Sequence, residues 1–382
     1  MTLEESEKRS SWFTTTTYNG IGTFLLIIVI VLTSIPILRR RAYNTFYYFH
    51  LFCSMSIFIG ASVHASTDFY LLFPGLVLYI IDLGMRAFSG DTSGSHKKVK
   101  AMIENAGADW YRITLAQWEK SLANDGDAIE PSNEKAVVMG DPLRHYYINI
   151  PTVSKLQNHA FTAAIPSSSK SGPVFLFQRS GGRKQKRLDK EWTWKFGALV
   201  PNTRDTVELD LRLEGPYASS DTQYKTASHI LCIVGGTGMT GAYSLAIWWL
   251  ETRASDEDST FTFVWSVRDQ DTVSLQEWQK LKDIAASTPR LELVAHVSSK
   301  NGRLDPVLHV NCALGIDGAS ADTNPVGEKE VAPKGSVWVY SSGPDGLINA
   351  TEDACVKARR TIRSGNQTPI GDISWYMAKW EV

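Results

Sequence analysis

One pair of histidines has a spacing that suits metal coordination inside an apolar segment. His50 and His64 lie in residues 42–67, which contain no Asp, Glu, Lys or Arg. In a helix they would be about 21 Å apart along the axis and about 40° apart around it, and therefore on one face. An ionisable residue inside a membrane span is a candidate functional residue, and each imidazole could supply an axial ligand to a haem iron. The alternative is a pair of interfacial histidines that bond to lipid or water.

A glycine-rich segment follows an apolar, strand-like run in the C-terminal half. The run HILCIV is followed directly by glycines in a G-x-G-x-x-G pattern that opens a helix-like stretch. Glycines at this junction let the backbone approach a pyrophosphate, and the free N–H groups of the helix N-terminus favour its charge. The alternative is a tight turn with no ligand. The predicted nucleotide-binding residues are Gly235, Gly236, Thr237, Gly238, Met239 and Thr240.

Two arginines indicate which nicotinamide nucleotide would bind. Arg268 follows the second apolar run of this half, where Asp269 is also present, and Arg303 follows the third. A guanidinium group suits a 2′-phosphate, whereas an NAD site usually places an acidic residue at the end of the second strand. The pair favours NADPH over NADH, although each arginine alone is also typical of an ordinary surface.

The N-terminal part contains three apolar runs of membrane-spanning length. They cover residues 21–38, 42–67 and 69–88. About 20 helical residues cross a hydrocarbon layer of roughly 30 Å. A cleaved signal peptide is the alternative for the first run, but its leader is acidic and no small-residue cleavage site follows. We expect residues 1–20 to form an extracellular segment and residues 21–88 to form three transmembrane helices.

The distribution of cations predicts how these helices are oriented. Arg39, Arg40 and Arg41 separate the first two runs, and lysines at 97, 98 and 100 follow the third, whereas residues 65–68 carry no cation. Under the positive-inside rule, the triple-arginine loop and everything after about residue 88 are cytosolic. The sequence therefore predicts a multi-pass membrane protein with a large cytosolic part.

Composition excludes several classes of protein. The chain has 39 basic and 40 acidic residues among 382 and so has no overall positive field that would hold a nucleic-acid backbone. Its four cysteines are scattered without a C-x-x-C pair, which argues against a disulfide framework and a zinc site. We expect no nucleic-acid partner.

The part after residue 90 divides into two patterns. Short alternating strands separated by Pro, Gly, Ser and Asn clusters predict an antiparallel β-barrel over residues 98–220. From residue 228 to 382, apolar strands alternate with helix-like stretches, which predicts a parallel α/β domain of the Rossmann-like type. The expected strands of the barrel lie at 109–115, 146–150, 160–165, 174–178 and 207–213. The cationic run at 183–190 is expected to be a solvated loop.

Read in order, the motifs resemble those of fungal ferric-reductase-like transmembrane components, within the wider group that includes NADPH oxidases. They are RRRAYNTFYYFH with His64, LQNHAFT, LEGPYAS, GGTGMT, VWSVRD, NGRLD and SSGPDGL. The resemblance implies a ferredoxin-NADP-reductase-like module, with FAD on the barrel and NADPH on the α/β domain. It also implies haem b at the two histidines and a plasma-membrane location. Ala160 and Ala218 depart from the family's motifs.

The resemblance also implies roles for individual residues. The FAD contacts would be His159, Phe161, Thr162, Arg179, Gly215, Pro216, Tyr217 and Trp380, with Trp375 as an alternative to the last. The nucleotide contacts would include Trp265, Arg268 and Arg303 besides the glycine loop. The residues bordering hydride transfer would be Thr162, Ser342, Gly343 and Pro344. Ser342 stands where many members of the family have cysteine.

Complete members of that family have about six spans and two histidine-bearing helices. The resemblance therefore implies that the first three spans are missing, or that a second copy or a partner chain supplies the remaining haem ligands. The implied activity is a metalloreductase that passes electrons from NADPH through FAD and haem to an extracellular ferric or cupric chelate. The alternatives are a superoxide-generating NADPH oxidase and a membrane-tethered flavin diaphorase or non-catalytic remnant without haem transfer.

Overall fold

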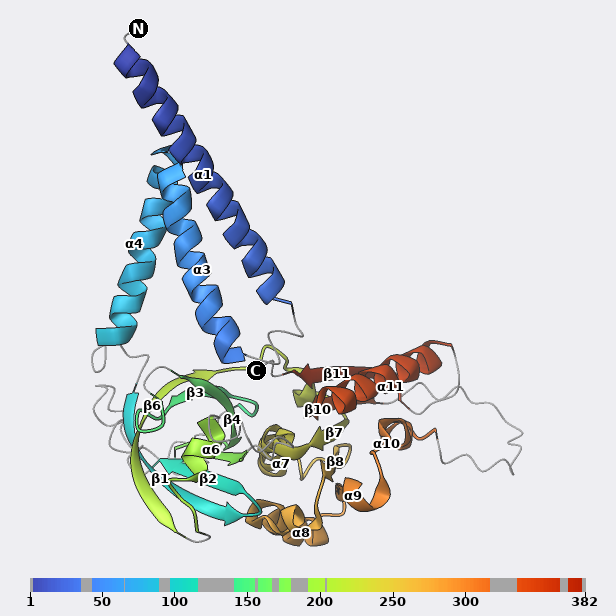
Figure 1. Ribbon diagram of the computed structural model, residues 1–382. Helices are drawn as coiled ribbons and strands as arrows, with labels where there is room; N and C mark the ends of the chain where they lie inside the picture. Colours follow the sequence, from blue (N-terminus) through green and yellow to red (C-terminus); the bar gives the residue numbers. More distant parts are fainter. Residues whose placement is uncertain are drawn as a thin grey trace, which may run out of the picture. The chain divides into compact units, whose positions relative to one another are not determined.

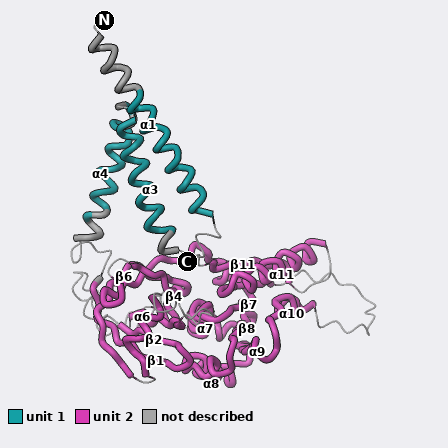
Figure 2. Tube along the Cα trace, viewed as in Figure 1, with its two compact units in different colours: residues 1–93, 380–382 teal, residues 94–379 magenta. Residues whose placement is uncertain are grey.

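The chain folds into two compact units in the computed structural model. One comprises residues 1–93 with 380–382, and the other comprises residues 94–379 (Figure 2). The structure describes residues 3–35, 43–64, 66–88, 97–115, 141–154, 157–166, 172–179, 192–202, 205–316, 335–364 and 370–379. The triple-arginine loop, the cationic run at 183–190 and Trp380 lie outside these ranges.

The first unit is helical (Figure 1). Its helices are α1 (Leu3–Thr33), α3 (Tyr43–His64) and α4 (Ser66–Phe88). Helix α3 packs against both α1 and α4. Large apolar side chains such as Phe24, Phe52 and Leu71 are exposed on these helices, as expected for surfaces that face lipid rather than water.

Within the described residues, two helices are long and apolar enough to cross a membrane, not the predicted three. These are Thr14–Thr33 and Phe46–His64. The third predicted span does form a helix of 23 residues, α4, but its apolar part covers only Phe69–Asp82. Asp82 and Arg86 in the last two turns shorten that part below the length needed for an upright span.

Helix α1 also differs from its predicted limits. It begins at Leu3 and runs without interruption through the predicted leader, and the apolar span begins at Thr14 rather than at residue 21. The residues between these points are Thr, Tyr, Asn and Gly, which carry no charge and so do not end an apolar helix. Residues 36–38, the predicted end of this span, lie outside the described ranges.

The second unit begins with a closed antiparallel barrel, as predicted. Its strands pair in the order β1-β2-β5-β4-β3-β6. They are β1 (Lys97–Gly107), β2 (Trp110–Leu115), β3 (His145–Asn149), β4 (His159–Ile165), β5 (Val174–Gln178) and β6 (Thr206–Tyr217). The short helix α6 (Trp192–Gly197) contributes Trp192 and Phe196 to the barrel core.

Strand β1 was missed from the sequence. Val99, Ala101 and Ile103 alternate and point into the barrel core. The pattern is hard to recognise because Met102, on the opposite face, is apolar yet 36% exposed. Closure of the barrel depends on this strand, since β1 pairs with both β2 and β6.

The rest of the second unit is a parallel five-stranded sheet in the order β11-β10-β7-β8-β9. Its strands are β7 (His229–Gly235), β8 (Thr260–Val267), β9 (Leu291–Val297), β10 (Ser336–Ser342) and β11 (Asp372–Ala378). Its α-helices are α7 (Met239–Thr252), α8 (Gln276–Ser287), α9 (Ser298–Asn301), α10 (Pro306–Ala313) and α11 (Asp345–Arg363). The 3₁₀ turns are η2 (Gln223–Lys225), η3 (Gly236–Gly238) and η4 (Gln270–Ser274).

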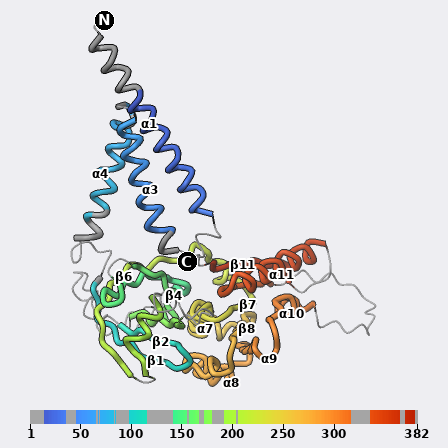
Figure 3. Tube along the Cα trace, in the orientation of Figure 1, coloured from blue at the N-terminus to red at the C-terminus, as the bar shows by residue number. Residues whose placement is uncertain are grey.

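The strand order reverses between β7 and β10. From β7 the chain moves outward to β8 and β9 and then returns to the other side of β7, as Figure 3 allows the reader to follow. In open parallel sheets, ligands bind beyond the carboxyl ends of the strands at such a switch point. The glycine-rich turn η3 follows β7 at this point.

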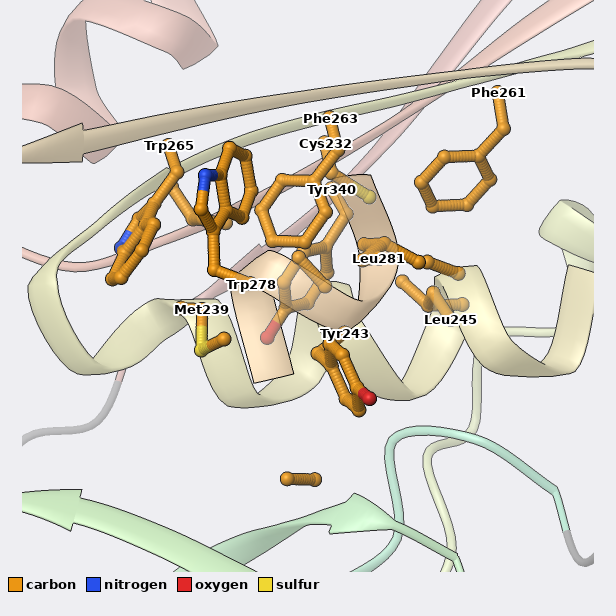
Figure 4. Close-up of a cluster of buried hydrophobic side chains, with 14 of the residues drawn as sticks. Cys232, Met239, Tyr243, Leu245, Phe261, Phe263, Trp265, Trp278, Leu281 and Tyr340 are labelled. Atoms are coloured by element: carbon orange, nitrogen blue, oxygen red, sulfur yellow. The ribbon is translucent and has the colours of Figure 1, made fainter. Parts of the chain in front are cut away.

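An aromatic core joins the sheet to the barrel. Side chains of β8, α7 and α8 meet on one face of the sheet, among them Phe263, Trp265 and Trp278 (Figure 4). The same cluster includes Trp110 and Leu176 from the barrel. The opposite face of the sheet packs against α10 and α11 around a separate cluster. The barrel and the sheet therefore share one buried apolar core within this unit.

A partly buried histidine at the start of β7 predicts acid sensitivity. Burial lowers the pKa of His229 to about 4, and its Nε2 lies 3.1 Å from the hydroxyl of Thr262. Because the unfolded chain binds this proton near its ordinary pKa of 6.5, stability is complete above pH 6.5 and falls as the pH drops toward 4. The loss over that window is on the order of 3 kcal/mol.

Chemical unfolding at a series of pH values, followed by near-UV circular dichroism, measures this slope. His229→Gln is expected to flatten it between pH 6.5 and 4, whereas Thr262→Val, which keeps the titrating imidazole, is expected to retain it. An unchanged slope in His229→Gln would assign the acid sensitivity to other groups.

Candidate functional site

The glycine loop after β7 packs directly on the end of β10. A Cβ atom at Gly238 would lie 2.4 Å from the carbonyl oxygen of Ser342. By contrast, Gly236 has a φ of +53° and no heavy atom within 4 Å of the position of a Cβ. Glycine at 238 is therefore required by packing within the chain, whereas the space beside Gly236 is open to a ligand.

Two side chains hold this loop in place. Trp265, which is fully buried, donates from Nε1 to the carbonyl oxygen of Gly236 at 3.0 Å. The hydroxyl of Thr240 donates to the carbonyl oxygen of Thr237 at 3.1 Å. Trp265 therefore holds the loop from its buried side, whereas Thr237 in the same loop is exposed.

Of the other predicted residues, Met239, Ser342 and Pro344 lie beside this loop. Met239 is buried under it as the first residue of α7. Ser342 is 3% exposed at the end of β10, and a Cβ at Gly235 would lie 2.9 Å from Cδ of Pro344. Arg268 and Arg303 are exposed.

The barrel presents an aromatic surface formed by His145, Tyr147 and Tyr217. The His145 and Tyr217 rings are stacked at 5.4 Å, and the Tyr147 ring meets Tyr217 edge-on at 5.7 Å. Across the sheet, His145 pairs with both Thr162 and Tyr217, so Thr162 lies in the same row. Tyr147 and Tyr217 are each 38% exposed. Exposed, rigid rings of this kind can stack against a planar heterocycle.

This aromatic surface and the glycine loop belong to neighbouring parts of the unit. Helix α7 packs on β4, and η3 contacts β5. Leu143, two residues before His145, lies 3.2 Å from the position of a Cβ at Gly241 in the first turn of α7. The loop with Gly236 and the helix that follows it therefore pack directly on β5 and β4 of the barrel.

The side chains of the three predicted flavin-binding residues on β4 do not all point to the same face of the strand. Thr162 is 9% exposed, whereas Phe161 packs against the barrel core. The rings of His159 and Phe161 lie 4.7 Å and 5.8 Å from that of Trp192. Successive residues on a strand point to opposite faces, so Thr162 faces away from His159 and Phe161.

His159 is a partly buried histidine with an unused nitrogen. Burial lowers its pKa, so the ring is neutral at pH 7. Its Nε2 is buried and has no hydrogen-bond partner among the described residues. A buried polar atom without a partner is costly, and it is the kind of group that a bound ligand would satisfy.

Arg179, predicted to pair with a phosphate, already has two partners. Its Nη2 lies 2.5 Å from a carboxylate oxygen of Asp109, and its guanidinium carbon lies 4.4 Å from the centre of the Trp194 ring. A phosphate at this position would share the arginine with Asp109. Gly215 and Pro216 lie at the end of β6 beside Tyr217, and Gly343 follows Ser342.

Trp375 does not lie on the side of the sheet that carries α7. Its ring packs with the α10 and α11 cluster, and the guanidinium carbon of Arg359 lies 4.1 Å from the ring centre. The barrel contacts the opposite, α7-bearing face. Trp375 is therefore poorly placed to cover a ring bound on the barrel.

Of the two histidines of the first unit, His64 contacts α1, and His50 contacts Ser34, the residue directly after α1. Nδ1 of His64 lies 3.1 Å from the carbonyl oxygen of Thr16, and Nδ1 of His50 lies 3.5 Å from Oγ of Ser34. The prediction that they share one face of a helix agrees with these contacts. Within the described residues, no cluster of three or more His, Cys, Asp or Glu side chains could hold a metal ion.

His145 and Tyr147 were missed from the sequence. The alternation in HYYIN, with Tyr146 and Ile148 buried in the core, would have placed His145 and Tyr147 on the outer face. What the sequence could not reveal is that Tyr217, 70 positions after Tyr147, joins them, because this contact depends on the pairing of β3 with β6.

A family model described as ferric reductase like transmembrane component matches residues 2–61. Ferric reductase transmembrane component 1 of Schizosaccharomyces pombe is 22% identical over 72% of this chain and 50% of that protein. Ferric reduction oxidase 3, mitochondrial, of Arabidopsis thaliana is 25% identical over 56% of this chain and 26% of that protein. The chain thus spans between a quarter and a half of the length of these relatives.

Solved structures similar to the chain include two reductases. The cytochrome b5 reductase domain of Ulva prolifera nitrate reductase is 16% identical, with a TM-score of 0.42, over 73% of this chain and 97% of that chain. The ferredoxin reductase in carbazole 1,9a-dioxygenase is 17% identical, with a TM-score of 0.41, over 68% of this chain and 64% of that chain. By the family model and the curated relatives, this chain is similar, at low identity, to ferric reductase-like proteins.

Proposed function

We propose that the chain is a membrane-bound oxidoreductase that passes electrons from NADPH to a metal chelate. The observation that carries the proposal is the direct packing of α7 and η3 on β4 and β5. It brings the open space beside Gly236 and the aromatic surface into one folded unit. A reductase of this kind needs both coenzymes in neighbouring positions.

The residues of the second unit fit the two coenzymes. The open side of the glycine loop suits a pyrophosphate, and Arg268 and Arg303 are available for a 2′-phosphate. The exposed rings of Tyr147 and Tyr217, on the face of the barrel that also carries Thr162, suit a flavin ring. When bound, NADPH supplies a hydride, FAD divides the electron pair into single electrons, and haem iron accepts them one at a time.

The chain's own residues would bind and orient these groups. The loop backbone would hold the nicotinamide nucleotide, and Trp265 would keep the loop in shape through its bond to Gly236. Thr162 and the aromatic surface would orient the flavin ring. The buried Ser342, with Gly343 and Pro344 beside it, would exclude water where the two rings meet.

The first unit would carry the haem-binding residues. His50 and His64 would each hold one iron, and a second copy or a partner chain would supply the opposite ligands. In this proposal α4 is a third span, whose short apolar part is accommodated by local thinning of the bilayer. The protein lies in the plasma membrane, with residues after about 88 in the cytosol. A chelated ferric or cupric ion is the substrate, and dioxygen is the alternative acceptor.

The runner-up is a flavin diaphorase without transfer through the membrane. It is favoured because the described residues of the first unit contain one histidine-bearing helix and two clear spans. In this reading, NADPH would reduce the flavin, and a soluble acceptor on the same side would be reduced directly.

Proteoliposomes separate these readings. The full chain, loaded with FAD and haemin, is reconstituted with a ferric chelate trapped inside, and NADPH is added outside under anaerobic conditions. The proposal predicts reduction of the trapped chelate, abolished by His64→Leu, with reduction of an external dye retained in that variant. Reduction of the external dye alone in the unmodified chain would establish the diaphorase instead.

A further inference from the structure

Helices α1 and α3 meet along a closely packed seam of small residues. A Cβ at Gly20 would lie 2.6 Å from Cε1 of His64, and a Cβ at Gly60 would lie 2.3 Å from Oγ1 of Thr23. The side-chain amide of Asn19 donates to the carbonyl oxygen of Gly60 at 2.7 Å. Small residues and interhelical hydrogen bonds of this kind bring membrane helices together.

The partner of His64 on α1 determines which ring nitrogen carries the proton. Nδ1 of His64 lies 3.1 Å from the carbonyl oxygen of Thr16. A carbonyl oxygen can only accept, so Nδ1 must donate. In a neutral imidazole the other nitrogen, Nε2, then has a lone pair. Gly20 leaves the room in which the ring takes this position.

The same reasoning holds for His50 at the other end of the seam. Nδ1 of His50 lies 3.5 Å from Oγ of Ser34, and that hydroxyl donates its own hydrogen to the carbonyl oxygen of Ile30 at 2.7 Å. With its hydrogen used, the Ser34 oxygen accepts from His50. The Phe46 ring, 5.1 Å away, packs against the imidazole. Both histidines therefore have Nδ1 protonated and Nε2 as a base.

We propose that α1 is the positioning element for both histidines: the Thr16 carbonyl with Gly20, and the Ser34 hydroxyl, fix the Nδ1–H tautomers and leave each Nε2 to bind iron. Histidines that ligate metals usually donate their other N–H to a carbonyl or similar acceptor, and loss of that partner lowers metal affinity by about 10- to 100-fold. The role in iron binding rests on the proposed function; the tautomers follow from the contacts alone.

The first test measures the tautomers in the full chain without haem. Histidine labelled with ¹⁵N reports Nδ1–H and Nε2–H forms through its chemical shifts, and the variants His50→Gln and His64→Gln assign the signals. In the unmodified chain we expect the Nδ1–H form at both positions. In Gly20→Ala we expect this form to be lost at His64 and retained at His50. An Nε2–H form at His64 in the unmodified chain would overturn the proposal.

The second test measures haemin binding with matched glycine variants. Gly20→Ala displaces the His64 ring, Gly60→Ala disturbs the same seam at Thr23 without touching a histidine, and Gly22→Ala has nothing within 4 Å. We expect haemin affinity, followed by the Soret band, to fall about 10- to 100-fold in Gly20→Ala only. Circular dichroism verifies that each variant is folded, and Ser34→Ala tests the His50 end in the same way.

The outcomes separate this inference from the proposed function. Equal losses of affinity in Gly20→Ala and Gly60→Ala would show that general seam packing, not positioning of His64, matters, and so would overturn the inference. If the unmodified chain has both Nδ1–H tautomers but binds no haemin, the tautomer assignment stands and the haem part of the proposed function fails.

Discussion

Gly238→Ala is expected to unfold the nucleotide loop and abolish NADPH binding. The added Cβ would lie 2.4 Å from the carbonyl oxygen and 2.6 Å from the carbonyl carbon of Ser342. Both atoms belong to the backbone of β10, so neither can move as a flexible side chain would. Overpacking of this kind costs on the order of 3 kcal/mol. Thermal unfolding of the full chain and calorimetric titration with NADPH measure the two effects.

Two other glycines provide matched controls for this prediction. Gly236→Ala adds a methyl group to open space at a φ of +53°, which costs about 1–2 kcal/mol in strain. If the pyrophosphate lies there, this variant keeps the fold and loses about tenfold or more in affinity. Gly346→Ala has nothing within 4 Å and is expected to change neither quantity. Normal nucleotide binding by Gly236→Ala would place the nucleotide elsewhere.

Arg112→Met is expected to destabilise the second unit by about 3 kcal/mol, because it leaves a buried carboxylate without its cation. Arg112 on β2 of the barrel donates from Nε to Glu277 at 2.6 Å and from Nη2 to Gln276 at 3.0 Å, both in the first turn of α8. Glu277 is 4% exposed, and its Oε2 has no hydrogen-bond partner among the described residues. This ion pair joins the barrel to the α/β half of the second unit.

The expected loss of stability depends on burial of the ion pair. A second, exposed ion pair in the barrel tests this dependence. Lys100 and Glu208 lie 2.5 Å apart, but their side chains are 52% and 49% exposed. Water screens such a pair, so Lys100→Met is expected to have little effect on the unfolding midpoint. The double variant Arg112→Met, Glu277→Met is expected to recover much of the lost stability. Equal effects of Arg112→Met and Lys100→Met in denaturant unfolding would contradict this account.

The sequence predicts local features well and long-range features poorly. Strands β7, β8, β9 and β10 and the loop at Gly236 follow from runs of apolar residues and from glycine spacing, which act locally, whereas β11 was not predicted. Strand β1 was missed because its alternation is masked by Met102, and its partners lie on β2 and on β6, about 100 residues away. The third span was overestimated because it was extended past Asp82 and Arg86 to Phe88, whereas the apolar part of α4 ends at Asp82.

The candidate site likewise has features that the sequence could indicate and features that it could not. Thr162 and the glycine loop could be proposed from motifs, and packing within one unit supports their proximity. The aromatic surface could not be predicted from motifs, because the stacking of His145 on Tyr217 depends on the register between β3 and β6. Nor could the sequence reveal that Trp265 is buried and bonds to Gly236 rather than facing a ligand.

Anaerobic titration of the purified, FAD-loaded chain with NADPH most directly tests whether the barrel and the sheet form one reductase. The account predicts that the flavin absorption band bleaches in proportion to the NADPH added, and that Gly236→Ala requires much higher NADPH concentrations. A chain that retains FAD and binds NADPH, yet shows no bleaching of the flavin, would contradict it.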